Sequence, residues 1–112
     1  MRNVVTWLQA IEKGYEPRLY SYQIEDVPVG EYDAVLDCKV WANKIMGICC
    51  YFTQKCTGKK FQLTVYRRLV DKIYKLKSSD IDFTECPLNC AYHIRVSIHE
   101  KGRAVFEEVS LV

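Results

Sequence analysis

The chain has 112 residues, of which 49% are hydrophobic and 27% are charged. These values are typical of a single globular domain and exclude a disordered chain. No apolar run approaches the ~20 residues that span a bilayer, so no membrane partner is expected. Residues 1–6 lack the apolar core of a signal peptide, and a cytoplasmic protein is therefore expected.

The formal net charge of +2 conceals a strong segregation of charge along the chain. Residues 12–37 carry seven acids and two bases, residues 38–77 carry ten bases and Asp71 alone as an acid, and residues 78–112 carry six acids and three bases. A surface with one basic region between two acidic ones is expected.

The first element expected is a short amphipathic helix over residues 4–13, with Asn3 as its N-cap and Gly14 as its C-terminal stop. Its apolar residues recur at helical spacing, and we expect this stripe to pack on the sheet that follows. The residues of this stripe are Val4, Trp7, Leu8 and Ile11. Residues 15–30 form an extended lead-in, with a short edge strand over 19–24.

The longest structural signal runs from Tyr32 to Arg68 and predicts three antiparallel strands. Apolar and polar residues nearly alternate over Tyr32–Ala42, which is typical of a half-buried strand. Turns at residues 43–44 and 57–58 lead into the next two strands, IMGICCYFT and FQLTVYRR. In the first strand we expect one face to carry Tyr32, Ala34, Leu36, Cys38 and Val40, and the other to carry Asp33, Asp37 and Lys39.

The remaining chain predicts one more helix and a hairpin. Leu69, Ile73 and Leu76 have the spacing of a short helix over Leu69–Lys77, and residues 78–88 are typical of a loop. The last strands are joined at residues 101–102. The register expected places Arg95 opposite Glu108, Ile94 opposite Val109 and Ile98 opposite Val105, with a bulge near Phe106.

This order of elements, three strands, a short helix and two strands, resembles the OB-fold over residues 31–110. The resemblance implies a mainly β fold: a small antiparallel OB-like barrel of five strands with a short helix between strands 3 and 4. An N-terminal helix and lead-in would occupy residues 1–30, and the barrel or a curled sheet residues 31–112, within one domain. A six-stranded SH3-like barrel and an α+β sheet are the alternatives.

Domains that resemble OB-folds bind single strands across strands 2 and 3, with basic side chains for phosphates and aromatic faces for bases. Trp41 and Tyr51 have the opposite parity from the apolar residues of their strands, so we expect both to share an outer surface with Tyr66. The function expected is non-enzymatic binding of single-stranded DNA or RNA. The nucleic-acid-binding residues predicted are Trp41, Lys44, Tyr51, Lys59, Lys60, Tyr66, Arg67 and Arg68.

Two other interpretations use the same residues. A small accessory or inhibitory protein, of the kind that mobile elements carry, would dock this basic face on the acidic surface of a protein partner. Alternatively, the aromatic residues pack under the N-terminal helix and the lysines are simply solvated. Sequence does not separate these interpretations, and a monomer or weak dimer is compatible with each.

Neither an enzyme nor a cofactor is expected. Cys90 and His93 lie three residues apart on a predicted strand, so they face opposite sides, and no Gly-rich phosphate loop is present. The six cysteines are interpreted as reduced thiols. No metal site is predicted, because the nearest candidates, Cys86, Cys90 and Cys56, lack zinc-site spacing.

Overall fold

The computed structural model describes residues 3–16, 27–42, 46–76 and 79–112. They form one mainly antiparallel six-stranded sheet and one short helix. In this part of the chain no helix combines the length and hydropathy needed to cross a bilayer. The elements are β1 (Val4–Val5), α1 (Trp7–Glu12), β2 (Gly30–Ala42), β3 (Gly47–Gln54), β4 (Lys60–Tyr66), β5 (Ala91–Ile98) and β6 (Ala104–Leu111).

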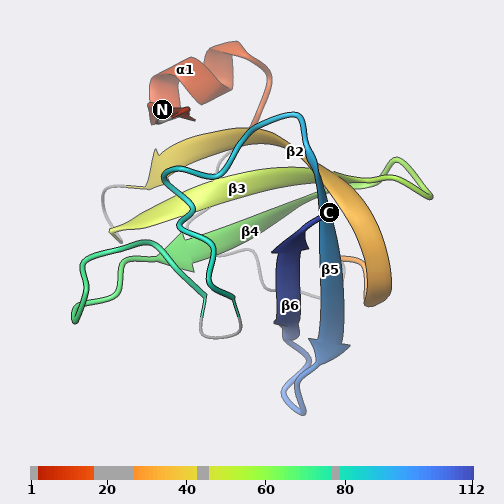
Figure 1. Cartoon of the computed structure of the whole chain (residues 1–112). Coiled ribbons are helices and arrows are strands. Elements are labelled where there is room, and N and C mark those ends of the chain that lie inside the picture. Colours follow the sequence, from red (N-terminus) through yellow and green to blue (C-terminus); the bar gives the residue numbers. More distant parts are fainter. Residues whose placement is uncertain (1–2, 17–26, 43–45, 77–78) are drawn as a thin grey trace.

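The long strand β2 is the centre of the sheet. It pairs with β3 on one side, and on the other side with β5 through its first half and with β1 near its end. The order of the main strands is β4-β3-β2-β5-β6. Because β2 bends strongly, β5 crosses in front of the right-hand ends of β3 and β4, and β6 lies beside β5 (Figure 1). The outer strands β4 and β6 are not paired within the described residues, so the sheet is curled and a closed barrel is not observed.

The described residues form six strands and not the five predicted, because residues expected in the N-terminal helix form β1 instead. Val4 and Val5 pair in parallel with Lys39 and Val40 of β2. The helix α1 therefore begins only after Thr6, not after Asn3. Thr6 and Gln9 form a capping box, in which each side chain accepts a hydrogen bond from the backbone N–H of the other.

The apolar stripe of α1 does not pack on the sheet as expected. Ala10 is the buried residue of the helix, whereas Trp7, Leu8 and Ile11 are exposed. Ala10 joins a small cluster on the outer face of β2 and β3. The other buried members of this outer cluster are Cys38, Val40, Ala42, Cys49 and Tyr51.

A β-bulge at Asp37 divides β2 into two halves that face opposite ways. The pairing of β2 with β3 shifts between Leu36 and Cys38, which leaves Asp37 as the extra residue. Side chains alternate with a period of two, so one extra residue moves every later side chain to the other face. The prediction that Cys38 and Val40 share a face with Leu36 is therefore wrong, and Lys39 turns into the main core instead of toward solvent.

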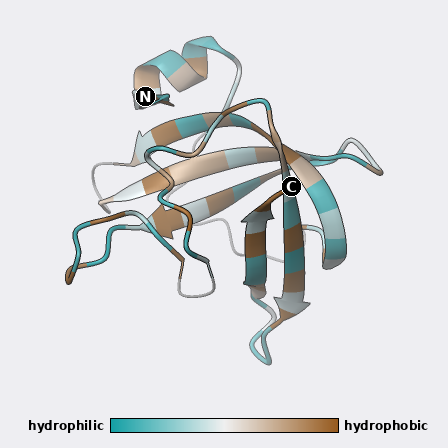
Figure 2. Ribbon diagram, in the orientation of Figure 1, coloured by the Kyte–Doolittle hydropathy of each residue, from teal (hydrophilic) through white to brown (hydrophobic). Residues whose placement is uncertain are grey.

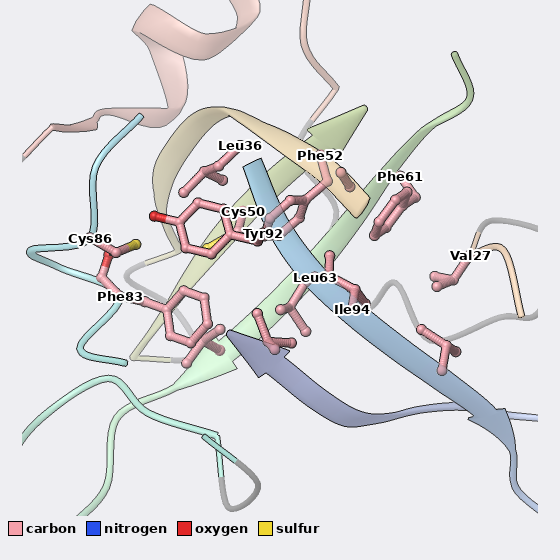
Figure 3. Packing of buried hydrophobic residues seen from close by; sticks show 14 of the residues in the cluster. Val27, Leu36, Cys50, Phe52, Phe61, Leu63, Phe83, Cys86, Tyr92 and Ile94 are labelled. Carbon is pink, nitrogen blue, oxygen red and sulfur yellow. The ribbon is translucent and has the colours of Figure 1, made fainter. Parts of the chain in front are cut away.

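The main core lies inside the curled sheet and is rich in aromatic rings. Phe52 of β3 stacks on Phe61 of β4, with ring centroids 5.5 Å apart, and meets Tyr92 of β5 edge-on at 5.9 Å. Figure 3 shows these rings among the aliphatic residues from both layers. Phe61 also stacks with Phe106 of β6 at 6.4 Å. Ring packing thus brings the unpaired outer strands together.

The predicted helix over Leu69–Lys77 is wrong throughout its described part, residues 69–76. The backbone N–H of Arg68 donates to the carbonyl of Ile73 at 2.8 Å, and Arg67 forms an antiparallel bridge with Tyr74. Lys72 has a φ of 59°, which an α-helix does not accommodate. Residues 67–74 therefore form a small hairpin, which we call the basic hairpin.

The predicted turns and final register are largely recovered. Gly58 has a φ of 73° in the β3–β4 turn, as expected, whereas the turn at 43–44 and the edge strand at 19–24 lie outside the described residues. In β5–β6 the predicted pairs Arg95–Glu108 and Ile94–Val109 are confirmed, together with a bulge next to Phe106. Ile98 pairs with Ala104 instead of Val105, because the bulge shifts the later pairs by one residue.

Candidate nucleic-acid interface

The three aromatic residues predicted to stack on bases do not share one surface. Tyr51 is only 9% exposed and packs against Tyr15 in the outer cluster, with ring centroids 4.9 Å apart. Trp41 lies on the opposite face, because the bulge at Asp37 reverses its direction, and it packs against the main core. Tyr66 remains accessible, at 44% exposure. The expectation of one shared aromatic face is therefore wrong.

The predicted basic residues separate into two groups along the edge strand β4. Lys59 and Lys60 are exposed at its start, whereas Arg67 and Arg68 are half-buried just beyond its end. Seven residues at about 3.3 Å each put roughly 20 Å between the groups. Lys44 lies outside the described residues. One compact ligand could not contact both groups.

A pocket of about 330 Å³ opens beside the second group. Three segments form it: the end of β2, the basic hairpin and the loop over 82–85. Trp41 and Arg67, both predicted site residues, are thus brought together with residues that the sequence did not indicate. The lining residues are Trp41, Arg67, Lys72, Ile73, Tyr74, Asp82, Thr84 and Glu85.

The walls of this pocket are tied to one another. Trp41 contacts Tyr74 edge-on, with ring centroids 5.4 Å apart, which joins β2 to the basic hairpin. The backbone N–H of Phe83 donates to the carbonyl of Tyr74 at 2.9 Å, and the Phe83 ring is fully buried in the core. The pocket therefore rests on the core and is shaped before any ligand arrives.

Lys39 anchors the third wall from inside the protein. Its side chain is 0% exposed, and its Nζ donates to the carbonyl oxygens of Thr84 at 3.3 Å and Cys86 at 2.6 Å. These bonds fasten a loop without regular structure to β2. Sequence patterns did not reveal this role, because a bulge has no clear signature in an alternating segment and Lys39 was assigned to the solvent face.

The cations in and next to the pocket differ in whether they already form an ion pair with a carboxylate. Within the described part of the chain, the side chains of Arg67 and Lys72 have no hydrogen bond or ion pair, whereas Arg68 lies 3.7 Å from Asp71. On the loop over 82–85, Asp82 accepts hydrogen bonds from the backbone N–H and the hydroxyl of Thr84. The pocket thus combines available cations, an aromatic ring and carboxylates.

The cysteines form no cluster of the kind that would hold a metal. Among the described residues, no three His, Cys, Asp or Glu side chains are placed to coordinate one ion. Cys56 is exposed in the β3–β4 turn, while Cys86 is buried beside Lys39. Burial raises the pKa of the Cys86 thiol, which disfavours the reactive thiolate.

A second, larger depression of about 710 Å³ lies along β6. Its lining carries one cation, Arg95, which is 3.9 Å from Glu108, and further carboxylates from Asp80 and Glu107. It has no aromatic ring. Because of this charge and composition, the depression suits a polyanion less well than the pocket beside Trp41 does.

His93 on β5 forms a separate charged group with two carboxylates of β2. Its Nε2 lies 2.7 Å from Glu31 and its Nδ1 lies 3.0 Å from Asp33. Ionised carboxylates only accept hydrogen bonds, so both contacts are satisfied together when both ring nitrogens are protonated. The hydrogen bonds to Glu31 and then to Asp33 raise the pKa of His93.

We expect the stability of the protein to depend on pH through His93. Because the folded pKa is raised, the stabilisation is complete below about pH 6.5, the ordinary value, and is lost as pH rises through the folded pKa. Urea unfolding at several pH values should show this decline in the native protein and not in His93→Gln. Glu31→Gln should reduce the decline more than Asp33→Asn, because Glu31 makes the shorter contact. The same pH dependence in His93→Gln would contradict the assignment.

Comparisons of the chain with protein-family models, curated proteins and solved structures find no match.

Proposed function

We propose that this protein binds single-stranded nucleic acid at the pocket beside Trp41 and along the basic hairpin. The observation that carries the proposal is that Arg67 and Lys72, whose side chains have no ionic partner among the described residues, line the same pocket as the Trp41 ring. A nucleotide needs both features, cations for its phosphate and an aromatic face for its base. The binding is non-enzymatic and is expected in the cytoplasm.

The carboxylates of the pocket fit this ligand better than they fit a simple anion. Asp82 and Glu85 would repel a free phosphate, but a carboxylate such as that of Asp82 accepts several hydrogen bonds and can receive one from the amino group of a base. The volume of about 330 Å³ lies at the lower end of the range for small-ligand sites, which is appropriate for one nucleotide unit.

The strand order supports the resemblance to OB-like domains on which the proposal draws. Counted from β2, the order β4-β3-β2-β5-β6 places the third strand and the last strand at the two edges. Pairing of these edges would complete a five-stranded barrel, and OB-folds are partly open barrels. The difference is the ligand site: we place it at the end of β4, because Tyr51 on the outer face is buried.

The test is fluorescence anisotropy of a labelled ~20-nucleotide single strand, in competition with duplex DNA and duplex RNA and at several salt concentrations. The native protein should prefer the single strand, and its affinity should fall with salt because phosphate contacts release counterions. The variant Arg67→Glu/Lys72→Glu should lower the salt slope by about 1.4, since each single-strand phosphate contact contributes about 0.7.

Two further variants locate the interface. Lys60→Glu, at the other end of β4, tests the larger basic face predicted from sequence, and Lys101→Glu in the exposed β5–β6 turn is the matched control. Lys101→Glu should bind like the native protein. In a Trp7→Phe background Trp41 is the sole tryptophan, and its emission should be quenched when a base stacks on it. No binding at low salt, or equal losses in Lys101→Glu and the pocket variant, would contradict the proposal.

A protein-interaction module remains the second candidate, and α1 favours it. Trp7, Leu8 and Ile11 form an exposed apolar stripe that a partner could cover, while the basic hairpin meets an acidic surface on that partner. If oligonucleotides fail to bind, retention of one partner by the native protein and its loss in a Trp7→Ala/Ile11→Ala variant would support this function.

A further inference from the structure

The tip of the basic hairpin carries two aliphatic side chains that make almost no contact with the rest of the protein. Leu69 is 85% exposed and Val70 is 88% exposed, the highest values among the large hydrophobic residues described. The loop that follows β4 extends away from the sheet (Figure 1), and its outer end is hydrophobic (Figure 2). Adjacent exposed aliphatic residues at a projecting tip form a small apolar patch, and exposed apolar patches are the parts of a surface where ligands and partners bind.

The backbone of this tip is held in one conformation. Below the tip, Arg67 and Tyr74 form a β-bridge, and the N–H of Arg68 donates to Ile73 at 2.8 Å. The N–H of Lys72 donates back to the carbonyl of Arg68 at 2.9 Å, which closes the turn. Leu69 and Val70 are therefore presented on a braced support and not on a loose loop.

The segment that carries the tip also carries cations, and their charge indicates the kind of surface it meets. Residues 67–75 carry Arg67, Arg68, Lys72 and Lys75 and the single acid Asp71. Arg68 lies 3.7 Å from Asp71 and Lys75 lies 3.2 Å from Asp80, so Arg67 and Lys72 are the two cations of this segment without an ion pair among the described residues. An apolar tip beside two available cations fits a ligand that presents anionic groups next to apolar faces. A nucleic-acid strand offers both, with anionic phosphates along its backbone and the apolar faces of its bases beside them.

We infer that Leu69 and Val70 form a wedge that inserts between neighbouring bases of the bound strand and unstacks them. This inference rests on the proposed function and gives the tip a role distinct from that of the pocket. The pocket holds one nucleotide, and the wedge separates that nucleotide from the next. An anionic bilayer would also suit an apolar tip beside cations. It would leave the adjoining pocket of Trp41, Arg67 and Lys72 unused, so the strand is the better fit.

The test uses a single strand that contains 2-aminopurine, whose fluorescence rises when its neighbours are unstacked. The native protein should raise this fluorescence on binding. Leu69→Ser/Val70→Ser should bind about tenfold more weakly, since two apolar side chains lose their burial, and should give no rise. Its salt slope should equal that of the native protein, because the cations are untouched. Leu69→Ile/Val70→Ile, which keeps the apolar tip, should restore the rise.

The outcomes separate the wedge from the proposed function. Two results would overturn the wedge and leave strand binding intact, provided that anisotropy shows binding. One is a fluorescence rise in the serine variant equal to that of the native protein. The other is no fluorescence rise with the native protein. No anisotropy change with the native protein overturns both. A further result is that the native protein binds no strand but co-sediments with phosphatidylserine vesicles, and that the serine variant fails to do so. That result would assign the tip to a membrane surface and overturn the wedge.

Discussion

Replacing Lys39 by alanine should lower the free energy of unfolding by about 3 to 5 kcal/mol, because two buried carbonyl oxygens lose their donor and the side-chain stem loses its packing. Lys39 is fully buried and donates to Thr84 and Cys86. Each buried acceptor left unpaired costs about 1–3 kcal/mol. Urea unfolding of the native and variant proteins at neutral pH measures the difference.

Lys39→Met distinguishes the hydrogen bonds from the packing. Replacing buried charged groups with apolar ones is often neutral, provided that their partners are replaced as well. Here the partners are backbone carbonyls, which no side-chain substitution removes, so Lys39→Met should still lose about 2 kcal/mol or more. The exposed Lys60→Ala is the control and should change stability by less than about 0.5 kcal/mol. Native stability in Lys39→Met would show that other donors satisfy these oxygens.

Phe52→Ala should destabilise the protein by about 3 to 5 kcal/mol, the usual range for a fully buried phenylalanine. The Phe52 ring is 0% exposed and contacts Phe61 on β4 and Tyr92 on β5. Its loss leaves a cavity between the two layers of the curled sheet, where surrounding rings cannot collapse without moving the backbone. Urea unfolding monitored by circular dichroism should show a lower midpoint with a similar slope.

The matched control for this prediction is Leu69→Ala, an aliphatic truncation at a residue that is 85% exposed. It should leave stability within about 0.5 kcal/mol of native. Phe52→Leu should fall between the two, because leucine fills part of the cavity. If Phe52→Ala and Leu69→Ala were equally stable, the rings would not form the core that joins the layers.

The strands were predictable because they depend on local patterns. Alternation over Tyr32–Ala42 indicated β2, the glycine at position 58 indicated the β3–β4 turn, and the turn at residues 101–102 placed Arg95 opposite Glu108. Where a prediction is wrong, the local sequence was compatible with two structures, and contacts between distant residues determined which of them formed. Val4 has helical spacing with Trp7, but Val4 and Val5 pair with β2 instead.

The candidate site was predictable only in part, because its residues come from three separated segments. The sequence indicated a basic block and named Trp41 and Arg67, but it also named Tyr51, which is buried, and missed Lys72, Asp82 and Thr84. The spacing of Leu69, Ile73 and Leu76 predicted a helix that would have directed Lys72 elsewhere. The bridge between Arg67 and Tyr74 forms the hairpin instead.

By itself the sequence determined a mainly β chain, the positions of five of its strands and the concentration of positive charge between residues 38 and 77. These properties depend on side-chain alternation and composition, which are local. The tertiary structure decided which face each side chain occupies, because one extra residue at Asp37 reverses Lys39 and Trp41. One reversal therefore buries a lysine, turns a tryptophan toward the basic hairpin and creates the pocket on which the proposed function rests.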